Sequence, residues 1–284
     1  MKNIFIGGVP EHFNLPWYIA LKEKRFQQKD INLRWKDFPG GTGEMGQALR
    51  DNEIDMAVIL TEGIVRDIIH GNPSKIVQIF VDSPLLWGVH VAADSKFENI
   101  QDLKGTAAAI SKYGSGSHLM AFVNAENHDW DLQKDLFFKE IKDLEGAIES
   151  LPQGKGDYFM WEKFMTKPHV DNGTFRLIGV SPTPWPSFVI VVRDEILEKD
   201  PETIKTILEI INELTTDFKE IPAITEIISQ RYGQELDDVK EWLGLTHWSQ
   251  KQMTIRTLNK VQDELYKLGL VEKTLEPQEI LMDL

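Results

Sequence analysis

The chain has 284 residues and no cysteine. Without thiols it can form no disulfide bond, thiolate nucleophile, iron–sulfur cluster or cysteine-ligated zinc site. Its seven histidines lack the His-x-x-x-His and His-Glu-x-x-His spacings that are typical of metal-binding helices. The sequence therefore predicts no metal site and no cofactor.

Basic residues and long apolar runs are also scarce. Lys and Arg number 31 against 45 Asp and Glu, which gives a net charge of −14, and so acidic a protein repels nucleic acids and anionic membranes. No apolar run approaches the ~20 residues that a transmembrane helix needs. We therefore expect neither a nucleic-acid partner nor a transmembrane segment.

The start of the chain carries no recognisable export signal. After Met1 and Lys2 it soon runs Ile-Phe-Ile-Gly-Gly, which is typical of a strand and a turn. An export signal would have a basic start, an apolar stretch and a small-residue cleavage site. The predicted location is the cytoplasm for the chain as written, and the periplasm or cell surface if an export signal has been removed.

Common catalytic and nucleotide-binding motifs are missing as well. The chain has two glycine-rich turns, near residues 40–43 and 114–117, and neither is followed by the Lys-Ser/Thr of a phosphate-binding loop. The glycines of residues 40–46 also lack the spacing of a dinucleotide-binding motif. The serines at positions 115 and 117 lack the Gly-x-Ser-x-Gly elbow of hydrolases. We predict no catalytic residue.

Short β-rich runs alternate with helical patterns over the first two thirds of the chain, which is typical of an α/β protein with mostly parallel sheets. From residue 194 onward, apolar residues recur at helical spacing instead. The expected strands are 3–6, 31–35, 56–59, 76–80, 87–91, 106–110, 136–139, 158–160, 175–180 and 188–192. The expected helices are 15–24, 43–51, 62–70, 117–126 and 143–151, and then 204–214, 223–231, 236–242 and 250–268.

Two of the expected strands, 87–91 and 188–192, are interpreted as crossings between two lobes. We predict that residues 1–88 and 191–284 form lobe 1, with the C-terminal helices packed on it, and that residues 89–190 form lobe 2.

A repeated order of features supports two similar lobes. Each has a helix, an acidic turn with Asp55 or Asp157, an apolar strand, and then Glu62 or Glu162. Such helix–turn–strand units are common in α/β proteins, so the repeat is suggestive of a duplication and no more.

A glycine-rich turn precedes one expected helix in each lobe. In α/β proteins such turns lie at the carboxyl ends of strands, where free backbone N–H groups bind ligands. The first turn contains Thr42 and Gly43, and the second contains Ser115, Gly116 and Ser117. We predict that these residues contact a ligand. The alternative is an ordinary turn in which the hydroxyl side chain caps the helix.

Aromatic residues, carboxylates and one histidine also fall at the expected strand ends. The aromatic rings are interpreted as the apolar wall of a small-molecule pocket, or alternatively as core. The carboxylates can accept hydrogen bonds from an amine or amidine, or alternatively favour the start of a helix. These predicted ligand contacts are His12, Phe13, Glu62, Trp161, Glu162 and Trp185.

Several short motifs occur in an order that resembles type II solute-binding proteins, and especially the nitrate, sulfonate and thiamine-precursor binders of ABC transporters. The resemblance extends from about residue 3 to about residue 220. The motifs that carry it are Gly7-Gly8-Val9-Pro10, Leu15-Pro16-Trp17-Tyr18-Ile19-Ala20, the stretch 41–45, Ala48-Leu49, Glu53-Ile54-Asp55-Met56-Ala57, Asp102-Leu103-Lys104-Gly105 and Gly114-Ser115-Gly116-Ser117.

The resemblance implies a two-lobed type II periplasmic-binding-protein fold, in which two crossing strands join the lobes and one small molecule binds in the cleft. It also implies ligand contacts at Thr42, at Thr61 and Glu62, and at Ser115 and Ser117. Proteins of this kind are normally exported.

The leading hypothesis is a solute-binding protein that captures a small polar or heteroaromatic molecule, acts as a monomer and delivers its ligand to an ABC permease. The alternative is a cytoplasmic enzyme of cofactor biosynthesis, of the thiamine-precursor or menaquinone type, on the same scaffold. The missing export signal favours the enzyme, and the missing acid–base constellation opposes it. A ligand-sensing regulator would need an appended DNA-binding or signalling domain, and the sequence indicates none.

Overall fold

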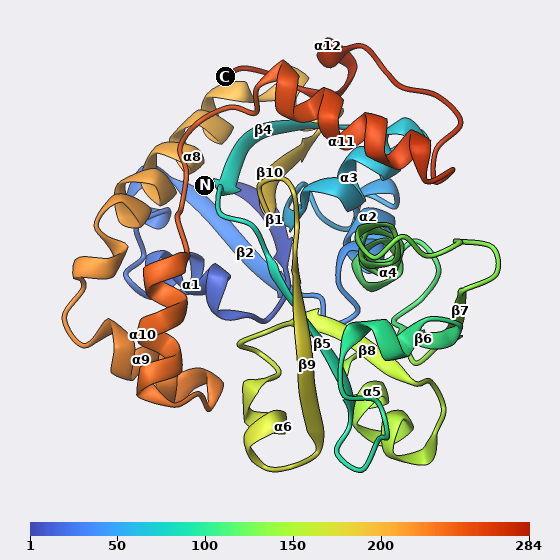
Figure 1. Cartoon of the computed structure of the whole chain (residues 1–284). Helices are drawn as coiled ribbons and strands as arrows, with labels where there is room; N and C mark the ends of the chain where they lie inside the picture. The colour runs from blue at the N-terminus through green and yellow to red at the C-terminus, as the bar shows by residue number, and fades with distance from the viewer. The chain divides into compact units, whose positions relative to one another are not determined.

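The computed structural model describes all 284 residues and contains two five-stranded sheets flanked by helices (Figure 1). The chain divides into two compact units. Unit 1 comprises Met1–Ser83, Trp185–Tyr232 and Val239–Leu284, and unit 2 comprises Pro84–Pro184 and Gly233–Asp238. The lobe boundaries expected after residues 88 and 190 remain a prediction. None of the helices combines the length and the hydrophobicity needed to cross a bilayer.

The sheet of unit 1 has the strand order β2-β1-β3-β10-β4. β1 (Lys2–Gly8) pairs in parallel with β2 (Ile31–Asp37) and β3 (Met56–Leu60), whereas β10 (Phe188–Arg193) runs antiparallel between β3 and β4 (Ser74–Val81). Every residue of β3 and β10 is buried, and nearly all are apolar. This is the composition expected of central strands that are covered on both faces.

Helices cover both faces of this sheet. α1 (Leu15–Lys22) and α8 (Pro201–Thr216) contact each other on one side, and α2 (Thr42–Arg50), α3 (Thr61–Ile69) and α11 (Ile255–Lys267) lie together on the other (Figure 1). The apolar stripe predicted at residues 204–214 is the buried face of α8. The remaining helices of the C-terminal part are α7 (Asp194–Lys199), α9 (Ile224–Tyr232), α10 (Leu236–Leu245) and α12 (Pro277–Ile280), with 3-10 turns η2 (Gln27–Lys29) and η5 (Phe218–Glu220) elsewhere in unit 1.

The sheet of unit 2 follows the same plan, in the order β7-β6-β8-β5-β9. β6 (Thr106–Ile110) pairs in parallel with β7 (Leu136–Glu140) and β8 (Tyr158–Glu162), whereas β5 (Leu86–Ala92) runs antiparallel between β8 and β9 (Phe175–Pro182). β5 therefore holds the position in this sheet that β10 holds in the other. Two α/β units with one inserted antiparallel strand each confirm the predicted fold class.

The helices of unit 2 lie on both faces of its sheet. α4 (Gly116–Asn127) contacts β6, β7 and β8. α5 (Leu144–Ser150) covers the opposite face, where its Ala147 joins a buried cluster with Ala109 and Phe159 (Figure 1). α6 (Lys167–Asp171) contacts β9, and the unit also has 3-10 turns η3 (Ile100–Leu103) and η4 (Leu151–Gln153).

The repeat predicted from the sequence has a structural counterpart, because its two aspartates make equivalent hydrogen bonds in the two units. Asp55 N donates to Phe5 O at 2.8 Å, and Phe5 N donates to Asp55 Oδ2 at 2.9 Å. Asp157 makes the same pair of bonds with Ala107, both at 2.8 Å. In each unit the acidic residue before the third parallel strand therefore fixes the register of the first strand.

The two glutamates of the repeat are not structurally equivalent. Glu62 lies in the first turn of α3, whereas Glu162 is the last residue of β8. Counted from the aspartates, Glu62 is seven positions on (62 − 55) and Glu162 is five (157 to 162). The order of features recurs as predicted, but β8 is followed by a turn where β3 leads directly into a helix.

Two boundaries differ from the sequence prediction. The helix expected over 250–268 begins only at Ile255, because the preceding residues are extended along the free edge of β4. There Ser249 N donates to Phe80 O at 2.9 Å, and Ile79 N donates to Lys251 O at 2.8 Å. Each strand expected as a crossing belongs wholly to one sheet, 87–91 (β5) to that of unit 2 and 188–192 (β10) to that of unit 1. The chain therefore passes between the sheets at residues 82–85 and returns at residues 183–187.

Replacing Asp55 or Asp157 by alanine should lower the stability of the protein by different amounts. Asp55 also accepts a hydrogen bond from Arg193 Nη2 at 2.8 Å, and both side chains are largely buried. We expect Asp55→Ala to lower the free energy of unfolding by roughly 3 kcal/mol, because it removes a carboxylate partner of a buried guanidinium. Asp157→Ala removes only a backbone N–H acceptor and should cost roughly 1 kcal/mol. Urea denaturation of both variants measures this difference, and equal losses would contradict it.

Candidate functional site

Seven of the predicted ligand contacts belong to unit 1, at the carboxyl ends of its parallel strands. Because β2, β1 and β3 are neighbours in the sheet, the loops that follow them meet at one edge. These residues are His12 and Phe13 in η1 (His12–Asn14) after β1, Thr42 and Gly43 at the start of α2 after β2, Thr61 and Glu62 at the start of α3 after β3, and Trp185 before β10.

Glu62 is fully buried, and only one of its carboxylate oxygens has a partner in the protein. Trp185 Nε1 donates to Glu62 Oε2 at 2.7 Å, whereas Glu62 Oε1 has no hydrogen-bond partner. Burial raises the pKa of Glu62 to about 7, and the hydrogen bonds from its own backbone N–H and from Trp185 only partly offset this effect. The second oxygen is therefore free to accept an N–H or O–H from a bound molecule.

The two threonines at this edge have different roles. Thr61 Oγ1 donates to Pro186 O at 2.6 Å, and Thr61 N donates to Ser187 O at 3.1 Å, so Thr61 fastens the start of α3 to the segment before β10. Thr42 Oγ1 is buried and has no hydrogen-bond partner. The cap of α2 is Gly41, whose φ of +71° suits glycine, and Thr42 is the first helical residue. The alternative that Thr42 caps the helix is therefore wrong.

Thr42 lies directly against the first turn of α3. A Cβ added to Gly63 would clash with Thr42 Cγ2, so glycine at this position lets the two helix starts approach each other. Gly63 follows Glu62 in the chain, and Gly43, half-buried, follows Thr42. The free oxygens of Glu62 and Thr42 therefore belong to adjoining helix starts.

His12 and Phe13 are anchored in an aromatic cluster of unit 1. The His12 ring stacks on Trp242 with ring centroids 3.9 Å apart and meets the rings of Phe13 and Tyr232 edge-on. Burial lowers the pKa of His12 well below its usual value, so the ring is neutral at physiological pH. Phe13 also packs on Phe188 at 5.0 Å. Both rings are rigidly held, and their role as ligand contacts remains a prediction.

In unit 2, Ser115, Gly116 and Ser117 form the start of α4. Ser115 caps the helix by accepting a hydrogen bond from His118 N at 3.4 Å. Ser117 Oγ accepts from Ser111 N at 3.0 Å and lies 3.0 Å from Ser115 Oγ. The first N–H groups of a helix have no partner within it, so this turn offers donors to a carbonyl or anionic group.

Trp161 and Glu162 end β8, the parallel neighbour of β6, and both make contacts of their own within unit 2. Trp161 stacks on Phe159 at 5.3 Å and packs against the cluster that α5 covers. Glu162 Oε2 accepts a hydrogen bond from Met165 N at 2.7 Å and so stabilises the turn after β8. The structure thus gives both residues a local packing role, and their predicted contact with a ligand stays a prediction.

The sequence analysis missed two buried polar residues at the same strand ends. Asn14 is fully buried; its Nδ2 donates to Val9 O at 2.8 Å, and its Oδ1 has no partner. Asparagine before a helix with proline in the first turn is a helix-start signal that would have pointed to it. Ser111, which directly follows β6, holds Ser117 in place. A polar residue immediately after an apolar strand is the signal there.

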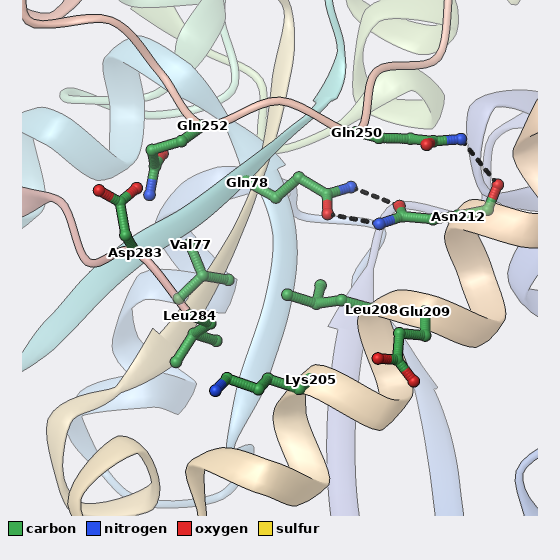
Figure 2. A pocket seen from close by; sticks show the side chains of 10 residues that line it. All are labelled: Val77, Gln78, Lys205, Leu208, Glu209, Asn212, Gln250, Gln252, Asp283 and Leu284. Atoms are coloured by element: carbon green, nitrogen blue, oxygen red, sulfur yellow. Dashed lines mark hydrogen bonds between the residues drawn. The ribbon is translucent and has the colours of Figure 1, made fainter.

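A separate pocket of about 280 Å³ opens in unit 1 between β4 and α8 (Figure 2). Gln78 and Asn212 donate amide hydrogen bonds to each other at 2.7 and 2.9 Å, and Gln250 Nε2 donates to Asn212 O at 3.0 Å. Figure 2 shows these side chains facing one another across the pocket. These amide hydrogen bonds tie α8 to β4, and the charged residues that line the pocket are Lys205, Glu209 and Asp283.

Comparison with known proteins supports the fold. A family model described as Ca3427-like PBP matches residues 87–180, which lie within unit 2. The structure of the CA3427 gene product of Candida albicans, described as a new family with the generic periplasmic-binding-protein fold, aligns with a TM-score of 0.91 and 25% identity, over 100% of this chain and 97% of that chain. No protein of curated function matches the chain.

Two bacterial structures are also similar. The alkanesulfonate-binding protein SsuA of Xanthomonas axonopodis pv. citri, bound to MOPS, aligns with a TM-score of 0.82 and 16% identity, over 99% of this chain and 98% of that chain. A ligand-binding component of an ABC-type import system from Staphylococcus aureus, with zinc bound, aligns with a TM-score of 0.77 and 13% identity, over 100% and 97%. The chain therefore has the periplasmic-binding-protein fold, and the predicted resemblance to type II binding proteins is confirmed.

The buried carboxyl group predicts a pH-dependent stability. Because the pKa of Glu62 is about 7 in the folded protein and 4.5 ordinarily, the folded state holds a proton between these pH values that the unfolded state has lost. This group therefore lowers the free energy of unfolding as the pH rises from 4.5 to 7, by roughly 3 kcal/mol in total, and has no further effect above.

Glu62→Gln keeps an acceptor for Trp185 and removes this titration. We expect the ligand-free variant to be more stable than the ligand-free parent protein, by a margin that grows between pH 5 and pH 7 and is constant above. Urea denaturation of both proteins at pH 5, 6, 7 and 8 measures the margin. A margin that does not change with pH would show that Glu62 titrates normally.

Proposed function

We propose that the protein is a non-catalytic solute-binding protein that captures a small polar or heteroaromatic molecule. The fold supports this proposal, and the observation that carries it is the pair of buried, unpartnered oxygens of Glu62 and Thr42. Leaving a polar group buried without a hydrogen bond costs free energy, so native proteins rarely do it. A ligand that supplies the missing donors accounts for both oxygens.

We also propose that the start of α4 in unit 2 contacts the ligand. Its backbone N–H groups and the paired hydroxyls of Ser115 and Ser117 can donate to an oxygen or ring nitrogen. One chain carries both groups of side chains, so binding as proposed needs no second copy of the protein. The similar Staphylococcus aureus protein is described as part of an ABC-type import system, and by analogy we propose delivery of the ligand to an ABC permease.

Ligand capture is tested on the purified protein before and after removal of bound molecules by unfolding and refolding. We expect native mass spectrometry to reveal a small molecule in the untreated sample, and we expect that molecule to raise the Tm of the refolded protein. If the untreated sample is empty and a broad panel of amines, sulfonates, pyrimidines and amino acids gives no thermal shift, the proposal is wrong. Release of a chemically altered compound would favour the enzyme alternative.

The two threonines provide a matched pair of variants. Thr42→Val removes a hydroxyl that has no partner in the protein, so we expect unchanged stability and roughly tenfold weaker binding of the co-purified ligand. Thr61→Val removes the hydrogen bond to Pro186 O, so we expect a loss of roughly 1 kcal/mol in stability. Calorimetric titration and urea denaturation distinguish the two effects. A Thr42→Val variant that binds normally would remove Thr42 from the site.

A further inference from the structure

We infer that the ligand presents a nitrogen-bearing cationic group, such as an ammonium or amidinium, to the free oxygen of Glu62, and that this position does not take a sulfonate or carboxylate. This inference rests on the proposed function. It assigns the chemical class of the ligand at the unit 1 strand ends, and it differs from the alkanesulfonate named for the similar Xanthomonas protein.

The first argument is the missing counter-ion. Glu62 is fully buried, and the only side chain that donates a hydrogen bond to it, the Trp185 indole, is neutral, as is its own backbone N–H. A buried carboxylate without a cation is among the costliest groups in a protein. A cationic ligand would convert this cost into a charge-assisted hydrogen bond, which is about twice as strong as a neutral one.

The surrounding helices supply no compensating charge. The charged residues nearest in position are Arg66, one turn further along α3, and those of the helices that pack against α3. None of them forms an ion pair with Glu62 or contributes to its raised pKa. Apart from Arg66, the charged groups of these elements are Asp67 on α3, Glu44 and Arg50 on α2, and Arg256, Lys260, Asp263, Glu264 and Lys267 on α11.

The second argument is the excess of acceptors at these strand ends. Glu62 Oε1, Thr42 Oγ1 and Asn14 Oδ1 are all buried and unpartnered, and they follow the three neighbouring strands β3, β2 and β1. While Glu62 is ionised, only the threonine of the three can also donate. Other unpartnered donors of unit 1 include the indole N–H groups of Trp17 and Trp242, whose side chains pack in aromatic clusters, and Nε of Arg66, one turn further along α3. A ligand group with several N–H donors complements this set, and a sulfonate, which only accepts, does not.

An anion can bind Glu62 only when the carboxyl group is protonated, and the pH dependence of binding distinguishes this case from cation binding. Protonated Glu62 could donate a hydrogen bond to an anion, so anion binding would strengthen as the pH falls below 7. The carboxylate form binds a cation, so cation binding strengthens as the pH rises through 7. The sign of the pH dependence therefore reports which class of group Glu62 holds.

The test compares ligands of the same ring and opposite charge. Benzamidine and benzylamine, which are both cationic at pH 6 and pH 8, are titrated against the refolded protein at these two pH values, alongside benzenesulfonate and benzoate. We expect at least one of the nitrogen compounds to raise the Tm, with a larger shift at pH 8 than at pH 6, and the two anions to give no shift. Glu62→Gln should reduce the affinity for the nitrogen compound roughly tenfold and abolish its pH dependence.

Two controls keep the result interpretable. Glu53→Gln alters an exposed glutamate of the same unit, which pairs with Lys36, and should leave binding and its pH dependence unchanged. The circular dichroism spectrum and Tm of Glu62→Gln show whether this variant folds. Thr42→Val is a second variant at the adjoining helix start, and it removes no charge. Loss of the pH dependence in Glu62→Gln but not in Thr42→Val supports the inference.

The opposite outcomes overturn it. A shift caused by benzenesulfonate or benzoate that grows at pH 6 would show that Glu62 acts as a donor to an anion, and the proposed solute-binding function would survive. Failure of both nitrogen compounds also rejects the inference. If the co-purified molecule then binds as an anion, only the ligand class is wrong, and if nothing binds at all, the proposed function fails with it.

Discussion

The start of α3 holds a carboxyl group that is fully buried and has only neutral hydrogen-bond partners. Everything proposed about this protein follows from that arrangement. The free energy of burying Glu62 has to be offset by the rest of unit 1, whose central strands are apolar and covered on both faces. A well-packed sheet can keep such a carboxyl group buried at a strand end. Without this support the side chain would turn toward water. Binding proteins typically keep an unfavourable buried group at the ligand site, because the stability of the surrounding scaffold offsets its free-energy cost.

The scaffold is built twice from one plan. In each unit an aspartate before the third parallel strand holds the first strand through the same two hydrogen bonds, and one antiparallel strand is inserted beside the third. The units then diverge in what they offer at the strand ends. Unit 1 presents the acceptors of Glu62, Thr42 and Asn14, and unit 2 presents the donors of a helix start that Ser115 caps.

Much of the fold could be predicted from the sequence, because alternating apolar strands and amphipathic helices have different periods. The helix expected at 250–268 shows the limit of this method. Residues 249–251 pair with the edge of β4, and an edge far away in the chain cannot be seen in a local pattern. Similarly, the aspartates of the repeat were recognised, but the two glutamates follow them at different distances, seven and five residues, and β3 and β8 are both five residues long. The spacing is visible in the sequence, but the residue at which each strand ends is not, so Glu62 and Glu162 were treated as equivalent.

The candidate site was only partly predictable for a related reason. The sequence places Thr42, Thr61 and Glu62 at strand ends, but it cannot show which hydroxyl is already used by the protein. The hydrogen bond from Thr61 to Pro186 O joins residues 125 positions apart, as the bond from Trp185 to Glu62 joins residues 123 apart. The helix-start pattern around Asn14 predicts a helix cap, whereas its side chain makes no cap hydrogen bond and leaves Oδ1 free, which only the structure shows. Only the three-dimensional structure distinguishes satisfied polar atoms from free ones.

A crystal structure of the protein with its co-purified ligand tests the central claim most directly. The account predicts a ligand nitrogen within hydrogen-bond distance of Glu62 Oε1 and a ligand donor or acceptor at Thr42 Oγ1. A ligand seated elsewhere, for example between β4 and α8, with both oxygens still unpartnered, would contradict it.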